Sequence, residues 1–203
     1  MKPYAAYAIG AALVDTEIEV SDEELVAMNV DKGMMTLVDA ARQSEMLAHL
    51  SDRLIRANHA SGGSAGNSMI ATALLGAPTY MSCKVAQDED GDIYLADLEQ
   101  SGVTHGLSHQ RQDGVTGKCL VLITPDAERS LNTNLAISET LSIDEVNETA
   151  IQDSEWVYLE GYQVTSPTGH AAALKTKALA QKHGALTAVS FSDPGMVKFF
   201  REN

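Results

Sequence analysis

Segments typical of strands and helices alternate along the chain from Ala57 onward, and no other feature restricts the fold as strongly. Apolar stretches at Thr79–Val85, Trp156–Leu159 and Ala185–Phe191 indicate strands, and helical segments separate them. Parallel strands need a crossover connection, which a helix usually supplies. The order therefore predicts an α/β fold with a mainly parallel sheet flanked by helices.

Capping signals predict where several helices begin and end. Ser21–Glu24 and Ser142–Glu145 have the Ser-x-x-Glu pattern, in which each side chain caps the backbone amide of the other residue. We expect the first helix to stop near Lys32-Gly33 and the second to run to Gln152. Further helices are predicted from Asp39 to about Leu50, over Gly91–Gln100, from Pro167 to His183-Gly184, and over Gly195–Asn203.

Two stretches interrupt the alternation, at about residues 16–38 and 103–124. The first contains strand-like Thr16–Val20 and Met34–Val38, and the second ends in Thr116–Thr124, which is expected to form a hairpin with Arg129–Leu135. We expect these stretches to form a small extra sheet that acts as a lid or an interface. The chain closes on a strand, a turn and a new helix, so we also expect later strands of the sheet to be missing or supplied from elsewhere.

Composition and charge narrow the class of protein. The chain has 203 residues, 44% of them hydrophobic, which suffices for one packed core. Its formal net charge of −14 disfavours binding to nucleic acid and to anionic membranes. Tyr4–Val14 is apolar and too short to cross a bilayer, so it fits either a buried first strand or a secretory signal. The acidic stretch that starts at Asp15, and Lys2 as the lone basic residue ahead, favour the strand.

Cysteines and histidines indicate neither a disulfide framework nor a metal site. Cys83 and Cys119 have no CxxC partner and are too few for a disulfide scaffold, so we expect two buried thiols and a reducing cytoplasm. His105 and His109 have no third ligand at a recognised spacing, and we expect exposed polar residues there.

Common phosphate-binding loops do not fit the sequence. Gly117-Lys118 is followed by Cys119 instead of Ser or Thr, and Gln112 occupies the place of the first Walker glycine. A dinucleotide fingerprint ending at Gly66 would need a glycine where Ser61 stands. A Rossmann oxidoreductase is therefore a distant alternative.

The stretch His59–Ala77 (HASGGSAGNSMIATALLGA) combines a glycine-rich turn with the start of a helix. Gly62-Gly63 allows a positive φ or a close approach of the backbone to a ligand. Ser64 to Asn67 lie in the first helical turn, where free amides favour electron-rich groups, and Asn67 offers both a donor and an acceptor. A site for a polyhydroxyl ligand and an ordinary capped turn both fit these residues.

The hexapeptide Gly62-Gly63-Ser64-Ala65-Gly66-Asn67, followed by Leu75-Gly76, resembles the first signature of the ribokinase/PfkB family of carbohydrate and nucleoside kinases. Further segments are similar to that family in the same order, over nearly all of the chain. These segments are Ile9–Asp15 at the first strand, Val85–Gly91, and three that resemble its adenosine-kinase-like branch, Thr116–Cys119, Glu128–Leu135 and Leu159–Tyr162.

The resemblance implies a ribokinase-like fold and a cytoplasmic kinase. Such an enzyme uses ATP and Mg²⁺ to phosphorylate the hydroxymethyl group of an adenosine-like nucleoside or of a sugar. Residues 1–203 would form the N-terminal part of one ribokinase-like domain. The resemblance also implies pairing of two copies through the lid.

The resemblance further implies roles for seven residues. Asp15 would accept hydrogen bonds from two ribose hydroxyls, because a carboxylate has two oxygens for this task. Arg129 would be catalytic, stabilising charge on the transferring phosphate. The other five would bind substrate, with Gly62, Gly63 and Asn67 at the sugar and Ser64 and Cys119 near the base or the lid.

The sequence departs from the family pattern at two places. Ala11 stands where this branch usually has Asn, four residues before the strand-end Asp, which puts one sugar or base contact in doubt. The Gly-Ala-Gly-Asp run that supplies the family's anion hole and catalytic base, and the Asn-x-x-Glu motif for magnesium, do not follow Asp193. We therefore expect this chain to be the substrate-binding and lid portion, inactive by itself. The alternative is a non-catalytic, truncated module that binds a nucleoside, a sugar or another chain.

Overall fold

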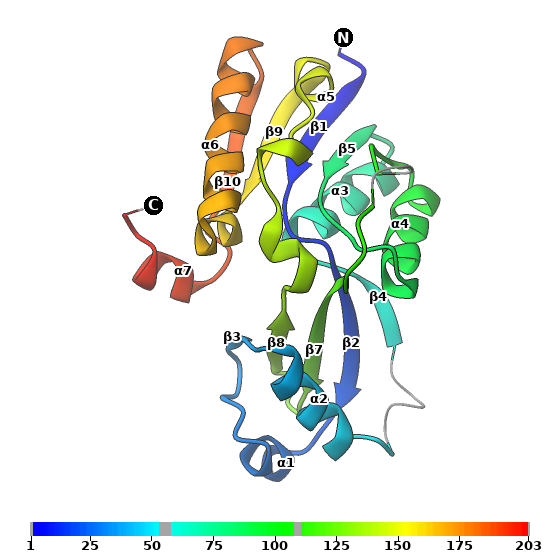
Figure 1. The fold of residues 1–203 in the computed structure, drawn as a ribbon, viewed down its shortest axis with the longest axis vertical. Coiled ribbons are helices and arrows are strands. Elements are labelled where there is room, and N and C mark those ends of the chain that lie inside the picture. Colours follow the sequence, from blue (N-terminus) through cyan, green and yellow to red (C-terminus); the bar gives the residue numbers. More distant parts are fainter. Residues whose placement is uncertain (1, 53–57, 108–110, 203) are drawn as a thin grey trace.

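The computed structural model describes residues 2–52, 58–107 and 111–202, and in that part of the chain ten strands form two sheets (Figure 1). The larger sheet has five parallel strands in the order β10-β9-β1-β5-β6, which confirms the predicted parallel α/β arrangement. Its strands are β1 (Tyr4–Ile9), β5 (Thr79–Ser82), β6 (Val103–His105), β9 (Ser154–Glu160) and β10 (Leu186–Ser190).

Helices cover both faces of the larger sheet, because its central strand is apolar on both sides. Along β1 the side chains alternate in direction. Tyr7 and Ile9 pack with residues of α5 (Glu148–Gln152) and α6 (Pro167–Lys182). Ala8 packs on the opposite face with residues of α3 (Ser64–Leu74) and α4 (Glu89–Gln100). Two cores, one on each side, therefore hold the parallel sheet.

The smaller sheet is mixed and has the strand order β3-β8-β7-β2-β4. β2 pairs in parallel with β7, and β7 forms the predicted antiparallel hairpin with β8. β4 runs antiparallel to β2 along one edge, and β3 runs parallel to β8 along the other. The bounds are β2 (Leu13–Glu19), β3 (Met35–Leu37), β4 (Asn58–Gly62), β7 (Gly117–Ile123) and β8 (Arg129–Asn134).

One face of the smaller sheet is closed by two short helices. Ile18, Leu120 and Leu122 from the strands pack with apolar side chains of α1 (Asp22–Ala27) and α2 (Ala40–His49). The opposite face carries Leu13, Cys119 and Val121, which form a separate apolar group. The smaller sheet and its helices occupy the lower part of Figure 1, below the larger sheet.

The prediction of a single strand over Tyr4–Val14 is wrong. β1 ends at Ile9 in the larger sheet, and β2 begins at Leu13 in the smaller one. The break lies at Gly10, where a Cβ would overlap the side chain of Ala65 and come within 2.8 Å of Glu160 Oε2. The absence of a side chain at Gly10 lets the chain pass closely over α3 and leave the larger sheet.

The predicted bounds of the small extra sheet, residues 16–38 and 103–124, are correct only in part. Residues 103–105 form β6, which pairs with β5 in the larger sheet. Of the second stretch only β7 belongs to the smaller sheet, and β4 and β8 complete it. The alternating pattern of a short edge strand resembles that of a lid strand, and only the pairing partner distinguishes the two.

Most helix starts are confirmed, but several helices differ in extent, and the last one, predicted over Gly195–Asn203, ends at Phe199. Both Ser-x-x-Glu boxes are present, Asp39 caps α2, and Ser166 caps α6 with Pro167 in its first turn. However, the helix predicted from Ser142 to Gln152 is split into a 3₁₀ turn, Ile143–Glu145, and α5, which Asn147 caps anew. The first helix ends at Ala27 instead of near Lys32, and Asn29 follows with a φ of 52°.

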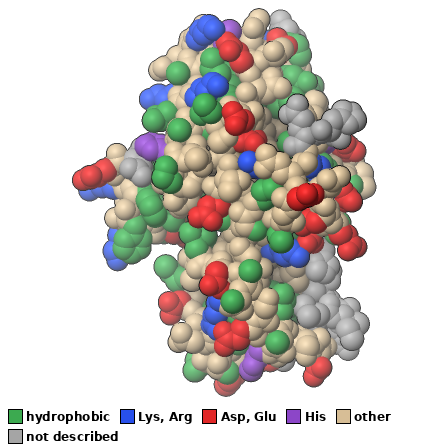
Figure 2. Space-filling model, in the orientation of Figure 1, with side chains coloured by type: hydrophobic (Ala, Val, Ile, Leu, Met, Phe, Trp, Pro, Cys, Tyr) green, Lys and Arg blue, Asp and Glu red, His purple; other side chains and the backbone are tan. Residues whose placement is uncertain are grey.

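Ala57 and His109 lie outside the residues that the structure describes. Within that part of the chain, none of the helices combines the length and the apolar character needed to cross a membrane. Figure 2 shows hydrophobic side chains gathered at α7 (Pro194–Phe199), where Val197 and Phe199 are exposed.

Leu122→Ala is expected to destabilise the protein by about 2–5 kcal/mol, because it leaves a cavity between the smaller sheet and its helices. Leu122 is fully buried in that core. Val26→Ala on α1 is the control, since Val26 is exposed and its truncation should change stability by less than about 0.5 kcal/mol. Urea denaturation measures both variants, and equal midpoints for the two would contradict the core assignment.

Candidate functional site

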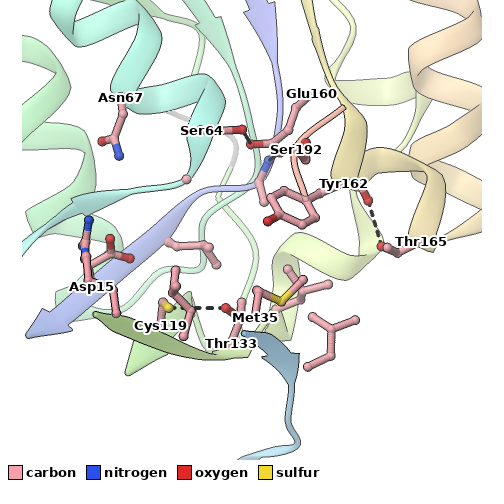
Figure 3. A pocket seen from close by; sticks show the side chains of 17 residues that line it. Asp15, Met35, Ser64, Asn67, Cys119, Thr133, Glu160, Tyr162, Thr165 and Ser192 are labelled. Carbon is pink, nitrogen blue, oxygen red and sulfur yellow. Dashed lines mark hydrogen bonds between the residues drawn. The ribbon is translucent and has the colours of Figure 1, made fainter. Parts of the chain in front are cut away.

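A cavity of about 230 Å³ lies where the smaller sheet meets the carboxyl ends of β9 and β10 and the start of α3 (Figure 3). Ligands of parallel α/β proteins usually bind at the carboxyl ends of the strands. Six of the seven residues singled out in the sequence line the cavity, and the seventh, Gly62, lies directly against Asp15. The six are Asp15, Gly63, Ser64, Asn67, Cys119 and Arg129.

Strand register brings three of these residues to one face of the smaller sheet. Asp15 on β2 is opposite Cys119 on β7, which is opposite Thr133 on β8. Arg129 lies four residues before Thr133 on β8, and therefore on the same face. Residues separated by more than a hundred positions in the chain thus line a single wall of the cavity.

The Asp15 carboxylate is a partly buried anion without a hydrogen-bond donor from the described residues. Burial raises its pKa to about 6, while the positive charge of Arg129 opposes the rise and Glu17 adds to it. A Cβ on Gly62 would overlap Asp15 Oδ1, so the carboxylate occupies space that only a glycine leaves open.

The glycine-rich turn brings the backbone to the cavity in a conformation that favours glycine. Gly63 precedes α3 with a φ of 86°, and a Cβ there would lie 2.5 Å from the carbonyl oxygen of Ala11. Gly63 has no side chain to cap the helix, and Asn67 follows in the first turn of α3. Figure 3 shows Asn67 across the cavity from Asp15's strand, so both polar groups border the same space.

Glu160 is a central residue of the site that the sequence reasoning did not select. Its carboxylate is 2% exposed and accepts hydrogen bonds from Ala11 N (2.8 Å), Ser64 Oγ (2.6 Å) and Ala65 N (3.0 Å). Gln163 Nε2 contributes a longer one at 3.3 Å. An acidic residue directly after the apolar stretch Trp156–Leu159 was the available signal. Because the Ser64 hydroxyl is bonded to Glu160, Ser64 supports the turn in this structure.

The opposite end of the cavity is largely apolar. Tyr162 lies just after β9 and points its ring toward the cavity (Figure 3). Burial raises its pKa to about 12, so the phenol stays neutral at physiological pH. The remaining apolar lining comes mainly from the smaller sheet and the segments next to it: Leu13, Met35, Leu37, Leu131 and Leu135.

Cys119 is a buried part of this wall. Cys119 is 1% exposed, and Thr133 Oγ1 donates a hydrogen bond to its sulfur at 3.3 Å. Burial raises the pKa of the thiol to about 12, which keeps it protonated and therefore a poor nucleophile. The thiol contributes shape and polarisability to the cavity.

Arg129 lies at the edge of the cavity, where its guanidinium donates to Glu17 Oε1 at 3.0 Å. Both side chains are substantially exposed, 51% for Arg129 and 37% for Glu17. The cavity therefore combines a buried carboxylate, an amide and a helix start at one side, an apolar wall at the other, and a cation at its edge. This arrangement suits a polyhydroxyl ligand that carries an apolar group.

The two-sheet α/β fold and the position of this cavity define a ribokinase-like protein. Residues 28–202 match the family described as "pfkB family carbohydrate kinase". The chain belongs to this family.

Solved structures and curated relatives agree with the family. The chain is similar to a "probable sugar kinase protein" from Rhizobium etli CFN 42 (29% identity, TM-score 0.93), covering 100% of this chain and 60% of that one. It is also similar to adenosine kinase from Sinorhizobium meliloti (33% identity, TM-score 0.90), covering 98% of this chain and 59% of that one. Mus musculus ribokinase matches over 67 residues at 28% identity, which is 33% of this chain and 21% of that protein. The chain thus spans about 60% of the length of the solved structures.

Asp15→Asn is expected to stabilise the protein by about 1–2 kcal/mol at pH 7.5, because it removes a carboxylate that is ionised in a partly desolvated place. The folded-state pKa of about 6 lies above the ordinary 3.8, so between these values the folded state binds more protons than the unfolded state. Stability contributed by this group is therefore lost as the pH rises through that window.

Urea denaturation of wild type and Asp15→Asn from pH 3.5 to 7.5 measures the effect. The two stabilities should converge below about pH 4 and separate as the pH rises to about 6.5. Asp113→Asn, at an exposed aspartate, should show no comparable gain. A lower stability of Asp15→Asn at pH 7.5 would contradict the description of Asp15 as an uncompensated carboxylate.

Proposed function

We propose that the protein phosphorylates the hydroxymethyl group of an adenosine-like nucleoside or of a sugar, with ATP as the phosphate donor, and that the cavity holds the acceptor. The observation that carries this proposal is the Asp15 carboxylate, which faces the cavity without a hydrogen-bond donor from the described residues, next to the Gly62-Gly63 turn. The family assignment and the kinase relatives support it. The activity is proposed for the whole protein, since the chain spans only about 60% of the solved kinases.

The chemistry of the cavity wall indicates how the acceptor is held. Ionised Asp15 accepts hydrogen bonds from two neighbouring hydroxyls, a geometry that the vicinal hydroxyls of ribose supply. Asn67 offers a donor and an acceptor, and the backbone at Gly63 can approach the sugar closely. Tyr162 and the leucine-rich wall leave a dry surface for a flat base. This apolar end favours a nucleoside over a free sugar.

Phosphoryl transfer depends mainly on positioning and on stabilising charge. Bound ATP would supply the phosphoryl group. Among residues 2–52, 58–107 and 111–202, no cluster of three or more His, Cys, Asp or Glu side chains fits a metal ion. Of this chain's own residues, Arg129 at the cavity edge is the cation proposed to stabilise charge on the transferring group.

We also propose that the smaller sheet acts as a lid over the acceptor, in a cytoplasmic enzyme. Its cavity-facing side carries the apolar wall, so movement of this sheet would change access to the site. Its two edge strands, β3 and β4, have unpaired outer sides within the described residues. Such edges can pair with a second copy, which would give a homodimer through the lid.

Adenosine binding is expected to depend on both ribose hydroxyls and on Asp15. Isothermal titration of the protein with adenosine, adenine and 2′,3′-dideoxyadenosine tests this. Loss of the hydroxyls, or Asp15→Asn, should weaken binding by about 10- to 100-fold, as for the loss of hydrogen bonds to a charged group. Equal affinity for adenosine and its dideoxy analogue would contradict the proposed role of Asp15.

A kinase assay on the whole protein separates two functions. ADP formation with adenosine, ATP and Mg²⁺ that Asp15→Asn abolishes would support the enzyme. Binding of adenosine without any turnover would instead identify the alternative, a non-catalytic nucleoside-binding module.

Ligand affinity should also rise with pH. Asp15 accepts two hydrogen bonds only when ionised, and its pKa is about 6. Affinity for adenosine is therefore expected to increase about tenfold between pH 5 and 7 and to level off above, as one ionisation requires. Asp15→Asn should show a flat profile over this range. A wild-type profile without an inflection near pH 6 would show that another group controls binding.

A further inference from the structure

Asp15 and Arg129 line the same cavity without forming an ion pair, although their charges interact. A partly buried carboxylate next to a guanidinium would ordinarily attract it, because an opposite charge offsets the cost of burial. In this structure the Arg129 guanidinium is hydrogen-bonded to Glu17 instead, at 3.0 Å. Glu17 therefore competes with Asp15 for the same cation.

The register of the smaller sheet explains how Glu17 reaches Arg129. Glu17 lies two residues after Asp15 on β2 and points to the same face. Arg129 is opposite Ile123 on β7, and Glu17 is opposite Val121 on that strand. The Arg129 side chain thus extends across β7 toward β2, where its guanidinium donates a hydrogen bond to Glu17.

Of the two carboxylates that line the cavity, Asp15 is the one left open to Arg129 if Glu17 is removed. The other carboxylate that lines the cavity, Glu160, already accepts hydrogen bonds from two backbone amides, a serine and a glutamine. The Glu17–Arg129 pair is also partly exposed, so it is weak and can exchange when a more highly charged anion approaches.

We propose that Glu17 is a positioning residue that holds Arg129 away from Asp15 and so keeps the Asp15 carboxylate open to the hydroxyls of the ligand. This inference rests on the proposed function, because it concerns the same acceptor site. Glu17 is not among the residues that line the cavity, so its proposed role does not require contact with the acceptor or the phosphate. It acts through the placement of Arg129, which can later leave Glu17 for a phosphate group.

The pKa of Asp15 provides a second test of the role proposed for Glu17, because charged and titratable groups surround this carboxyl group. Arg129 faces it from β8, Glu17 from its own strand, Cys119 from β7 and Tyr94 from α4. Removing the charge of Glu17 takes away a negative neighbour and lets the Arg129 cation approach. Both changes favour the ionised carboxylate, so the pKa of Asp15 should fall.

Adenosine titrations of Glu17→Gln, Arg129→Gln and the double variant test the proposal. Glu17→Gln should bind adenosine about tenfold more weakly at pH 7.5, because the ligand must displace Arg129 from Asp15. Its pH profile should shift to lower pH. The double variant should regain the affinity of Arg129→Gln within about twofold, since its Asp15 is open again. Glu155→Gln, the same charge change at an exposed position of β9, is the control.

The outcomes distinguish a failure of the role proposed for Glu17 from a failure of the proposed function. If wild type binds adenosine and Asp15→Asn does not, but Glu17→Gln matches wild type in affinity and pH profile, the role of Glu17 is overturned and the proposed function stands. A double variant weaker than Glu17→Gln alone also overturns it, because Arg129 would then help to bind the nucleoside. If wild type binds neither adenosine nor ribose in the same titration, the proposed function fails, and the inference about Glu17 fails with it.

Discussion

The hydrogen bonds of the Glu160 carboxylate hold the parts of the site together. This buried group joins the end of β9 to the link between β1 and β2, through Ala11 N, and to the start of α3, through Ser64 and Ala65. Three elements distant in sequence therefore meet at one acceptor. Its negative charge also lies at a helix N-terminus, where the helix dipole favours it. The glycine-rich turn and the passage from one sheet to the other depend on this position.

The two carboxylates of the cavity have opposite environments. Glu160 is fully buried and amply hydrogen-bonded, and it fixes the backbone. Asp15 is partly buried and lacks a donor among the described residues, which raises its pKa to about 6. A group of this kind lowers stability at neutral pH and is retained where a ligand supplies the missing partners. Arg129 and Glu17 adjust its charge from the edge of the cavity.

Local sequence patterns predicted most elements correctly and failed at particular residues. Caps and turn residues act over a few positions, so Ser21, Asp39 and Ser166 were sufficient to place helix starts. The apolar run Tyr4–Val14 hid a change of sheet, because both of its halves are buried and only the close approach at Gly10 marks the break. Likewise β6 belongs to the larger sheet because it pairs with β5, and such pairing leaves no local signature.

The sequence by itself determined the α/β class, the family likeness and the identity of seven candidate residues, because turns, caps and short motifs are encoded locally. The tertiary structure decided what those residues can do. Strand register set Asp15, Cys119 and Thr133 in one row, and burial made Asp15 an uncompensated carboxylate. Glu160 and Glu17 emerged only in three dimensions, since a carboxylate's role depends on which donors surround it, and those donors come from distant parts of the chain.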